Sequence, residues 1–415
     1  MQSTLADFIR GTPDGDEAAA ILRACVHCGF CTATCPTYQL LGDELDGPRG
    51  RIYLIKEVLE GAPVTAKTQL HLDRCLTCRA CETTCPSGVQ YGRLLDIGRH
   101  VVDQRVTRAP GDASRRWALL RGLRARPLFG GALALGRMFR PFLPRELRAK
   151  VPTESAAGIW PPARHSRRML ALDSCVQGAL APSIDAAMAR VLDRIGISLI
   201  PVAAGGCCGA LPHHLDAQAE ARAVIRRNID AWWPQVEGGA EAIVVTASGC
   251  GVMVKDYGHL MRLDPDYADK ASRISSLARD TVEVVAAEWP KIAPKVAMDI
   301  GAQKVAFHAP CTLQHGMKIR GQVEEILQAL GLELTRVADA HLCCGSAGSY
   351  SVLQPELSRR LKSAKLAALE AGRPDVIASA NIGCITHLAG GATRPVRHWI
   401  ELLDRRMVGG ERSPA

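Results

Sequence analysis

Two stretches of the chain repeat one spacing of cysteines: Cys25-Val-His-Cys-Gly-Phe-Cys-Thr-Ala-Thr-Cys-Pro36 and Cys75-Leu-Thr-Cys-Arg-Ala-Cys-Glu-Thr-Thr-Cys-Pro86. In each stretch three cysteines are separated by two residues, and a fourth follows three residues later, directly before a proline. Thiolates two residues apart can hold three corners of one iron–sulfur cube, whereas the fourth cysteine points away and can reach a second cube. The repeated spacing therefore predicts two iron–sulfur clusters whose ligands cross between the two stretches.

The predicted ligands divide into two sets of four. The spacing resembles that of two-cluster bacterial ferredoxins, in which the last cysteine of each motif binds the other cluster. We considered a pair of zinc sites and a disulfide knot, but zinc sites usually show two close pairs of ligands separated by a longer spacer. We therefore expect two 4Fe-4S clusters, one on Cys25, Cys28, Cys31 and Cys85, the other on Cys75, Cys78, Cys81 and Cys35.

The segment between the two cysteine motifs predicts helices. Residues 51–60 have apolar residues at helical spacing and no helix breaker, and Gly50 and Gly61 bound them. Residues 18–22 are expected to form a helix that leads into the first motif. Because small two-cluster ferredoxins join their motifs by strands, we interpret this N-terminal domain as an α-helical ferredoxin of the type found in dehydrogenase subunits.

Length and composition limit the class of protein. A chain of 415 residues exceeds one compact core and suggests two or three domains, and 47% hydrophobic with 22% charged residues excludes wholesale disorder. An acid at Asp7 argues against a secretory signal, and the charge-free stretch 127–136 is half the length of a spanning helix. Sixteen cysteines without such a signal favour metal ligands over disulfides. We expect a cytoplasmic metal-binding protein without a transmembrane helix.

The middle of the chain is strongly basic. Residues 105–150 contain twelve Lys and Arg residues and two acidic residues, which gives this segment a net charge of +10, compared with +9 for the whole chain. Apolar residues such as Trp117 and Phe139 alternate with these arginines, and Pro127 and Pro141 interrupt them. This mixture is typical of short amphipathic helices on an anionic membrane surface or against an acidic partner. A linker packed on its neighbouring domains is the open alternative. Nucleic acid is not expected, because aromatic residues are few and no binding module is visible.

The remaining eight cysteines belong to an internal repeat with a period of 136 residues, from Cys175 to Cys311. In each copy a strand leads to one cysteine, a second strand to Cys-Cys-Gly, and a third to a last cysteine. The expected strands cover residues 169–174, 197–202, 242–247, 304–310, 332–337 and 376–380. Strands that alternate with helices imply two α/β units with parallel strands, whose C-terminal ends meet at one edge. Each copy would thus gather four thiols, Cys175, Cys207, Cys208 and Cys250 in the first and Cys311, Cys343, Cys344 and Cys384 in the second.

This repeat resembles the cysteine-rich CCG domain, which is duplicated in heterodisulfide reductase subunits and in iron–sulfur subunits of several hydroxyacid dehydrogenases. The resemblance leaves open a further cluster in this region or reduced, structural thiols. The family pattern often closes with another cysteine, where this chain has Met253 and His387, which argues against an unusual non-cubane cluster. The glycine after each cysteine pair would let backbone amides approach the sulfur. We expect the nearby histidines to donate hydrogen bonds to ligands or to lie at the surface: His213, His214, His308 and His315.

Three longer stretches, residues 25–52, 71–89 and 381–388, resemble the family of glycolate oxidase iron–sulfur subunits. The resemblance implies an enzyme subunit that transfers electrons and has no substrate-oxidising site of its own. In that family a flavoprotein subunit oxidises glycolate to glyoxylate, and a second FAD-domain subunit accompanies it. The implied acceptor is a quinone at the membrane, which would place this chain peripherally on the cytoplasmic face of the inner membrane. The sequence agrees with a chain that carries no flavin of its own, because no G-x-G-x-x-G or P-loop motif for a flavin or nucleotide is evident.

Three alternatives stay open. The first is the equivalent subunit of a D-lactate or glycerol-3-phosphate dehydrogenase, which would have the same layout. The second is a heterodisulfide-reductase-like CCG subunit, which would carry out catalysis itself. The third is a zinc scaffold, which would be purely structural. We expect a helical ferredoxin domain over residues 1–104, a basic amphipathic linker over 105–165, and CCG repeats over 166–299 and 300–415.

Overall fold

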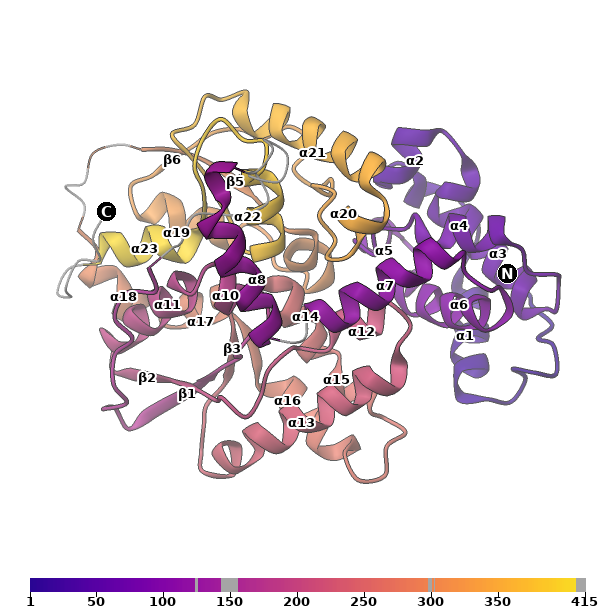
Figure 1. Ribbon diagram of the computed structural model, residues 1–415, viewed down its shortest axis with the longest axis horizontal. Helices are drawn as coiled ribbons and strands as arrows, with labels where there is room; N and C mark the ends of the chain where they lie inside the picture. The colour runs from indigo at the N-terminus through magenta and orange to yellow at the C-terminus, as the bar shows by residue number, and fades with distance from the viewer. Residues whose placement is uncertain (124–125, 143–155, 298–300, 302, 408–415) are drawn as a thin grey trace.

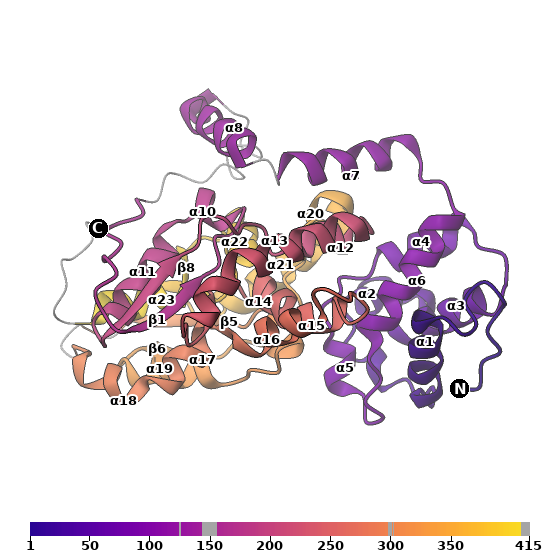
Figure 2. The same ribbon diagram turned by 90° about the horizontal axis from the view of Figure 1, so that it is seen from below.

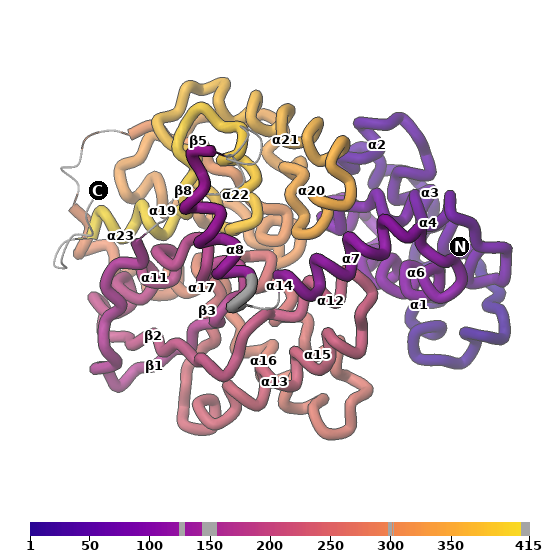
Figure 3. The backbone as a smooth tube through the Cα atoms, viewed as in Figure 1, coloured from indigo at the N-terminus to yellow at the C-terminus, as the bar shows by residue number. Residues whose placement is uncertain are grey.

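The computed structural model describes residues 1–123, 126–142, 156–297, 301 and 303–407. A helical domain with the N-terminus forms one end of the molecule, and two α/β units form the rest (Figure 1). The chain leaves the helical domain through helices that lie over the outside of the α/β units, as the backbone path in Figure 3 shows. The predicted fold class, a helical N-terminal domain followed by two parallel α/β units, is confirmed.

The helical domain is built around one hydrophobic core. Its elements are α1 (Pro13–Ala24), η1 (Phe30–Thr32), α2 (Pro36–Leu41), η2 (Glu44–Asp46), α3 (Pro48–Leu59), α4 (Ala66–Asp73), α5 (Ala80–Thr84) and α6 (Tyr91–Arg105). The threonine before α1, Thr12, accepts a hydrogen bond from the Gly15 amide at 3.0 Å, and Pro13 occupies the first turn. Such a cap satisfies an amide that the helix itself leaves unpaired.

Helix α3 confirms the helix predicted between the two cysteine motifs, and it begins three residues earlier than expected. It buries Ile52, Ile55 and Leu59. Its partner α6 presents Gly98, where a Cβ would lie 2.6 Å from Ile55 Cγ1. The glycine therefore lets α3 and α6 approach more closely than any other residue would allow.

Helices α7 (Pro110–Gly122) and α8 (Arg126–Met138), followed by η3 (Arg140–Phe142), lie along one edge of the molecule (Figure 2). Pro127 was expected to interrupt helix here, but it lies in the first turn of α8, where a missing amide is tolerated. Arg108 and Arg116 bind Asp73 of the helical domain at 2.7 and 3.1 Å, so part of the positive charge is paired. Residues 143–150 of the basic segment lie outside the described residues. Among the described helices, none is both long and apolar enough to cross a bilayer.

The first α/β unit contains a four-stranded parallel sheet in the order β2-β1-β3-β4. Its elements are β1 (Arg167–Ala171), α10 (Gln177–Leu180), α11 (Ser183–Asp193), β2 (Ile197–Pro201), α12 (Ala210–His214), α13 (Gln218–Glu237), β3 (Ile243–Val245), α14 (Ser248–Lys255), α15 (Tyr257–Leu260), α16 (Ala268–Leu277), β4 (Ala278–Asp280), α17 (Thr281–Ala287), α18 (Trp289–Ile292) and η4 (Ala293–Lys295). Strand β1 pairs with β2 on one side and with β3 on the other. In open α/β sheets, ligands bind outside the C-terminal ends of the strands where the strand order changes direction.

The second α/β unit repeats this topology in the order β6-β5-β7-β8. Its elements are β5 (Lys304–His308), η5 (Thr312–Gly316), α19 (Gln322–Ala329), β6 (Glu333–Leu334), α20 (Tyr350–Leu353), α21 (Pro355–Glu370), β7 (Val376–Ser379), α22 (Ile382–Ala389), β8 (Val396–His398) and α23 (Trp399–Arg406). Strand β6 is shorter than the predicted strand 332–337. Strands β4 and β8 were not predicted from the sequence, because each has only three residues and contains an arginine.

The two α/β units pack against each other. The largest hydrophobic core includes residues of both sheets, such as Val244 and Phe307. Ser248 at the start of α14 donates from its amide to Ala380 O at 3.1 Å, and its hydroxyl lies 2.7 Å from Thr312 Oγ1. The C-terminal edges of the two sheets, which carry the repeated cysteines, are therefore neighbours.

Candidate metal centres

The first group of thiols combines both ferredoxin-like motifs. Cys25 ends α1, Cys31 lies in η1, and Cys85 ends α5. Burial raises the pKa of Cys31 to about 11, with further contributions from Cys25, Cys28 and Cys85. A hollow that opens to solvent borders all four. The structure thus brings together the first three cysteines of one motif and the last cysteine of the other.

The second group is arranged in the mirrored way. Burial raises the pKa of Cys81, and Cys78, Cys75 and Cys35 raise it further. Cys35, the last cysteine of the first motif, therefore lies with the first three cysteines of the second motif. Cys81 and Cys35 are both buried, whereas Cys28 of the first group is exposed. The second group is the more enclosed of the two.

A buried arginine distinguishes the second group. Arg51 is 1% exposed, and its Nη1 donates to Thr37 Oγ1 at 3.2 Å. The Thr37 hydroxyl lies in turn 3.3 Å from Cys35 Sγ. On the far side, Asp46 accepts from Arg51 at 3.4 Å and from Arg74 at 2.8 Å. With two arginines around one carboxylate, this network leaves a net positive charge beside the thiols.

The first CCG-like unit gathers its four cysteines at the ends of β1, β2 and β3. Cys175 hydrogen-bonds with Cys207, which raises the pKa of Cys175 together with its burial and Cys250. Cys208 hydrogen-bonds with Cys207 and Cys250. The amide after the pair, Gly209 N, donates to Cys207 Sγ at 3.4 Å. The predicted approach of a glycine amide to sulfur is confirmed at this position.

The second CCG-like unit places its cysteines in the same way. Cys343 hydrogen-bonds with Cys311 and Cys344, and Cys344 with Cys384 in the first turn of α22. Gly345 N donates to Cys343 Sγ at 3.4 Å. Gly345 has φ +85°, and a Cβ there would lie 2.7 Å from Ser358 O. Glycine is therefore required at this turn.

The helical domain and the second unit meet at their cysteines. Cys311 lies beside Cys78 of the second thiol group as well as beside Cys343. Leu76 and Tyr350 pack in the same apolar cluster as Cys311 and Cys343, and Tyr350 Oη donates to Arg74 O at 3.2 Å. This contact could not be predicted, because no pattern in one sequence shows which surfaces of two domains meet.

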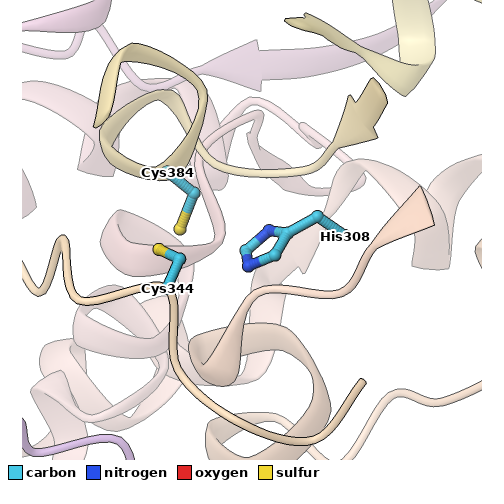
Figure 4. Close-up of side chains that lie close together, drawn as sticks. All are labelled: His308, Cys344 and Cys384. Carbon is cyan, nitrogen blue, oxygen red and sulfur yellow. The ribbon is translucent and has the colours of Figure 1, made fainter. Parts of the chain in front are cut away.

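The four histidines singled out in the sequence have different surroundings. His213 lies between the domains, with Nε2 3.3 Å from Asp96 Oδ2, and His214 lies beside that pair. His315 bridges the helical domain and the second unit, since its Nδ1 is 2.9 Å from Thr83 Oγ1 and its Nε2 2.9 Å from His341 O. His308 has its ring next to Cys344 and Cys384 of the second repeat (Figure 4).

The donor sets fit iron–sulfur clusters. Each ferredoxin-like group offers four thiols around one point, and sulfur is the ligand that such clusters take from proteins. Burial and the neighbouring thiols keep several of these groups protonated in the absence of a metal, so metal binding would release protons. A set of four thiols can also bind zinc, so the donor set alone leaves the metal to be tested.

Comparisons with known proteins agree with this division of the chain. The sequence model of a 4Fe-4S dicluster domain matches residues 21–89, and that of a cysteine-rich domain matches residues 169–255 and 305–389. The chain is 55% identical over 409 residues to "Glycolate oxidase iron-sulfur subunit" of Escherichia coli, covering 98% of this chain and 99% of that protein. It is 29% identical over 403 residues to "Probable glycolate oxidase iron-sulfur subunit" of Bacillus subtilis, which covers 90% of this chain and 89% of that protein. "Lactate utilization protein A" of Bacillus licheniformis is 25% identical over 242 residues, 56% of this chain and 97% of that protein.

Proposed function

This chain belongs to the family of glycolate oxidase iron–sulfur subunits, and from this premise we propose that it carries single electrons from glycolate oxidation to a membrane acceptor. Glycolate gives up two electrons as it becomes glyoxylate, so a flavin on a partner subunit must divide them into single steps. The observation that carries the proposal is the contact between Cys78 and Cys311, which joins the ferredoxin-like domain to the CCG-like units.

We assign one 4Fe-4S cluster to Cys25, Cys28, Cys31 and Cys85 and the other to Cys75, Cys78, Cys81 and Cys35. When bound, such clusters supply one-electron transfer. The protein's own part is to hold the thiols, to exclude water and to set the local charge. Arg51 places a positive charge beside the second set, which favours the reduced state there. The first set, with its exposed Cys28, is the side open to a partner.

The four thiols of each CCG repeat are proposed to hold a further cluster. In the second repeat the neighbouring cysteines run from Cys78 through Cys311, Cys343 and Cys344 to Cys384. This run begins at the second ferredoxin-like set and ends inside the α/β unit. Electrons can therefore pass between the two domains without crossing solvent.

The membrane is the proposed location of the acceptor, with quinone as the acceptor. Exposed apolar side chains gather on α7, α8 and η3, among them Trp117 at 63% and Phe142 at 84% exposure. Arg115 and Arg121 are exposed on α7. Apolar side chains mixed with arginines match the surface of a bilayer that contains anionic lipid. The partner subunits, by the same family relation, are FAD-binding proteins.

Addition of glycolate to the intact complex tests the function. The tagged chain is purified anaerobically from its own host with whatever it binds, and the visible absorbance of the clusters is followed. We expect glycolate to bleach this absorbance. If dithionite bleaches it and glycolate does not, although a flavoprotein is present, glycolate is not the donor. D-lactate and glycerol 3-phosphate are then the substrates to add, and the lactate utilization relatives make the first of these the stronger alternative.

The crossed ligand sets have their own test. Cys85→Ser should remove the cluster of the first motif, although Cys85 belongs to the second motif. The signal of the other cluster, followed by electron paramagnetic resonance (EPR), should persist. Cys250→Ser, in a CCG repeat, is the matched control and should leave both ferredoxin-type signals unchanged. Loss of the second-motif signal in Cys85→Ser would show that the sets are not crossed.

Membrane attachment is tested by flotation of the complex with lipid vesicles. Leu135→Ser and Met138→Ser on α8, combined with Phe139→Ser directly after it, should reduce binding to vesicles that contain phosphatidylglycerol. Leu263→Ser removes a side chain that is 64% exposed elsewhere on the chain and should leave binding unchanged. Equal binding by both variants would contradict the proposed surface.

A further inference from the structure

A buried imidazole lies among the thiols of the second CCG repeat. One ligand atom each of His308, Cys344 and Cys384 lies within 4.8 Å of the other two, and all three residues are buried. They come from three separate places in the fold, the end of β5, the loop after β6 and the first turn of α22 (Figure 4). The side chains point toward one another. An arrangement of this kind offers one nitrogen and two sulfur ligands to a metal.

The hydrogen bonds of His308 indicate which ring nitrogen is available. Its Nδ1 lies 2.9 Å from Ser379 Oγ, and the Ser379 hydroxyl is also 3.1 Å from the His308 carbonyl oxygen. The hydroxyl has one proton, and the carbonyl can only accept. Both contacts are satisfied together only when Ser379 donates to the carbonyl and accepts from Nδ1–H. The proton of the neutral ring is then on Nδ1, and Nε2 carries a lone pair.

Nε2 of His308 is buried and has no hydrogen-bond partner among the described residues. An unpaired buried nitrogen is costly, so such an atom in a folded protein calls for a partner. Histidines that bind metals commonly use one ring nitrogen for the metal and donate from the other to a fixed oxygen. His308 has this arrangement, with Ser379 as the fixed oxygen and the cysteine pair on the other side.

The first repeat lacks this feature. The residue three positions before its first cysteine is Leu172, which is buried in the hydrophobic core, whereas the second repeat has His308 three positions before Cys311. The second repeat also places Asn381 Nδ2 3.4 Å from Cys384 Sγ. The two repeats therefore share their thiols but differ in the one ligand that is not sulfur.

We propose that His308 binds, through Nε2, an iron of the cluster in the second CCG repeat, which makes that centre a mixed nitrogen–sulfur site beside an all-sulfur site in the first repeat. This inference rests on the proposal that the repeats hold clusters. It revises the expectation from sequence that His308 donates a hydrogen bond to a ligand. With Nε2 of His308 on one iron, one of the four thiols of this repeat is not needed as a ligand. A neutral imidazole in place of that thiolate makes the centre less negative and raises its reduction potential. Electrons arriving through Cys78 and Cys311 would then move toward the second repeat.

The test uses the holo-complex, reduced anaerobically, with the chain produced once with natural-abundance histidine and once with ¹⁵N-histidine. Pulsed EPR should detect one strongly coupled nitrogen on a centre distinct from the two ferredoxin clusters, and the label should convert its ¹⁴N pattern to ¹⁵N. His308→Leu, which copies the first repeat, should abolish this coupling. His387→Leu is the control, because His387 Nε2 already faces Ser358 Oγ at 3.4 Å, and it should retain the coupling.

Three results would overturn the inference. They are the absence of any strongly coupled histidine nitrogen in the wild-type complex, a coupling that persists in His308→Leu, and one zinc per chain with all iron accounted for by the ferredoxin domain. The wild-type labelling result stands even if His308→Leu fails to fold. Bleaching of the ferredoxin clusters by glycolate does not depend on His308. Failure of this inference is therefore distinguishable from failure of the proposed function.

Discussion

Replacement of Arg51 by glutamine should lower the reduction potential of the second ferredoxin-type cluster. The Arg51 Nη1 atom is 3.2 Å from Thr37 Oγ1, which is 3.3 Å from Cys35 Sγ, so the guanidinium lies at most 6.5 Å from that sulfur. With an effective dielectric constant of about 20, a unit charge at this distance contributes about 2.6 kcal/mol. For one electron this corresponds to about 110 mV. Electron density spread over the whole cluster lies farther away, so we expect a decrease of roughly 50–100 mV.

An anaerobic redox titration followed by EPR measures this shift. Arg51→Lys retains the charge and should restore most of the potential. Arg168→Gln, at the exposed start of β1 and away from the cysteine edge, is the matched charge deletion and should leave both potentials unchanged. Because Arg51 and Asp46 are buried together, Arg51→Gln also leaves a carboxylate with one partner fewer and should reduce stability. Potentials of both clusters within about 20 mV of wild type in a folded Arg51→Gln variant would refute the electrostatic reasoning.

Three further outcomes are expected. Gly345→Ala should reduce cluster content and lower the free energy of unfolding by at least about 2 kcal/mol, since φ is +85° and the new Cβ meets Ser358 O. Gly348→Ala, at φ +60° with open space around it, should lower it by about 1 kcal/mol. Both values are measured by denaturant unfolding, and equal losses would contradict the steric argument. Burial lowers the pKa of His213, but the contact with Asp96 leaves it raised overall. The charged contact between His213 and Asp96, which joins two domains, is therefore present at low pH and lost as the pH rises above about 6.5. Hydrogen exchange of α12 should therefore accelerate between pH 6 and 8 beyond its intrinsic increase, and a similar excess in His213→Gln would exclude this group as the cause. Arg79→Gly should relieve a left-handed backbone at φ 59°. It should also loosen α15, because the Arg79 guanidinium binds Asp256 at 3.1 Å. Unchanged hydrogen exchange in α15 would show that this ion pair does not hold the helical domain against the first α/β unit.

Local patterns predicted most of the fold. The helix α3 and the strands β1, β2, β3, β5 and β7 follow from apolar periodicity, because each buries a face whose spacing can be read directly. The strands β4 and β8 could not be predicted in this way. Each is a three-residue edge strand with an arginine at its centre, and it exists because the neighbouring strand offers unpaired backbone groups.

The candidate sites also divide into features that a sequence pattern indicates and features that depend on tertiary packing. The crossed sets that include Cys35 and Cys85 stay a prediction, and it was possible from sequence because the spacing repeats that of two-cluster ferredoxins. The contact of Cys78 with Cys311, the buried charge of Arg51 and the free nitrogen of His308 could not be predicted. Each depends on residues that are far apart in sequence and meet only through packing between domains or between strands.

The crossed arrangement of the cysteines has a consequence for how the protein is made. With the proposed sets, the first motif supplies three ligands when it leaves the ribosome, and its fourth, Cys85, is synthesised 54 residues after Cys31. The second motif likewise depends on Cys35, which was made earlier. Neither centre can be completed on a chain that ends before the second motif, so cluster insertion must follow synthesis of that motif. Delivery of iron and sulfur to this chain is thus timed by the position of its last ferredoxin-type cysteine.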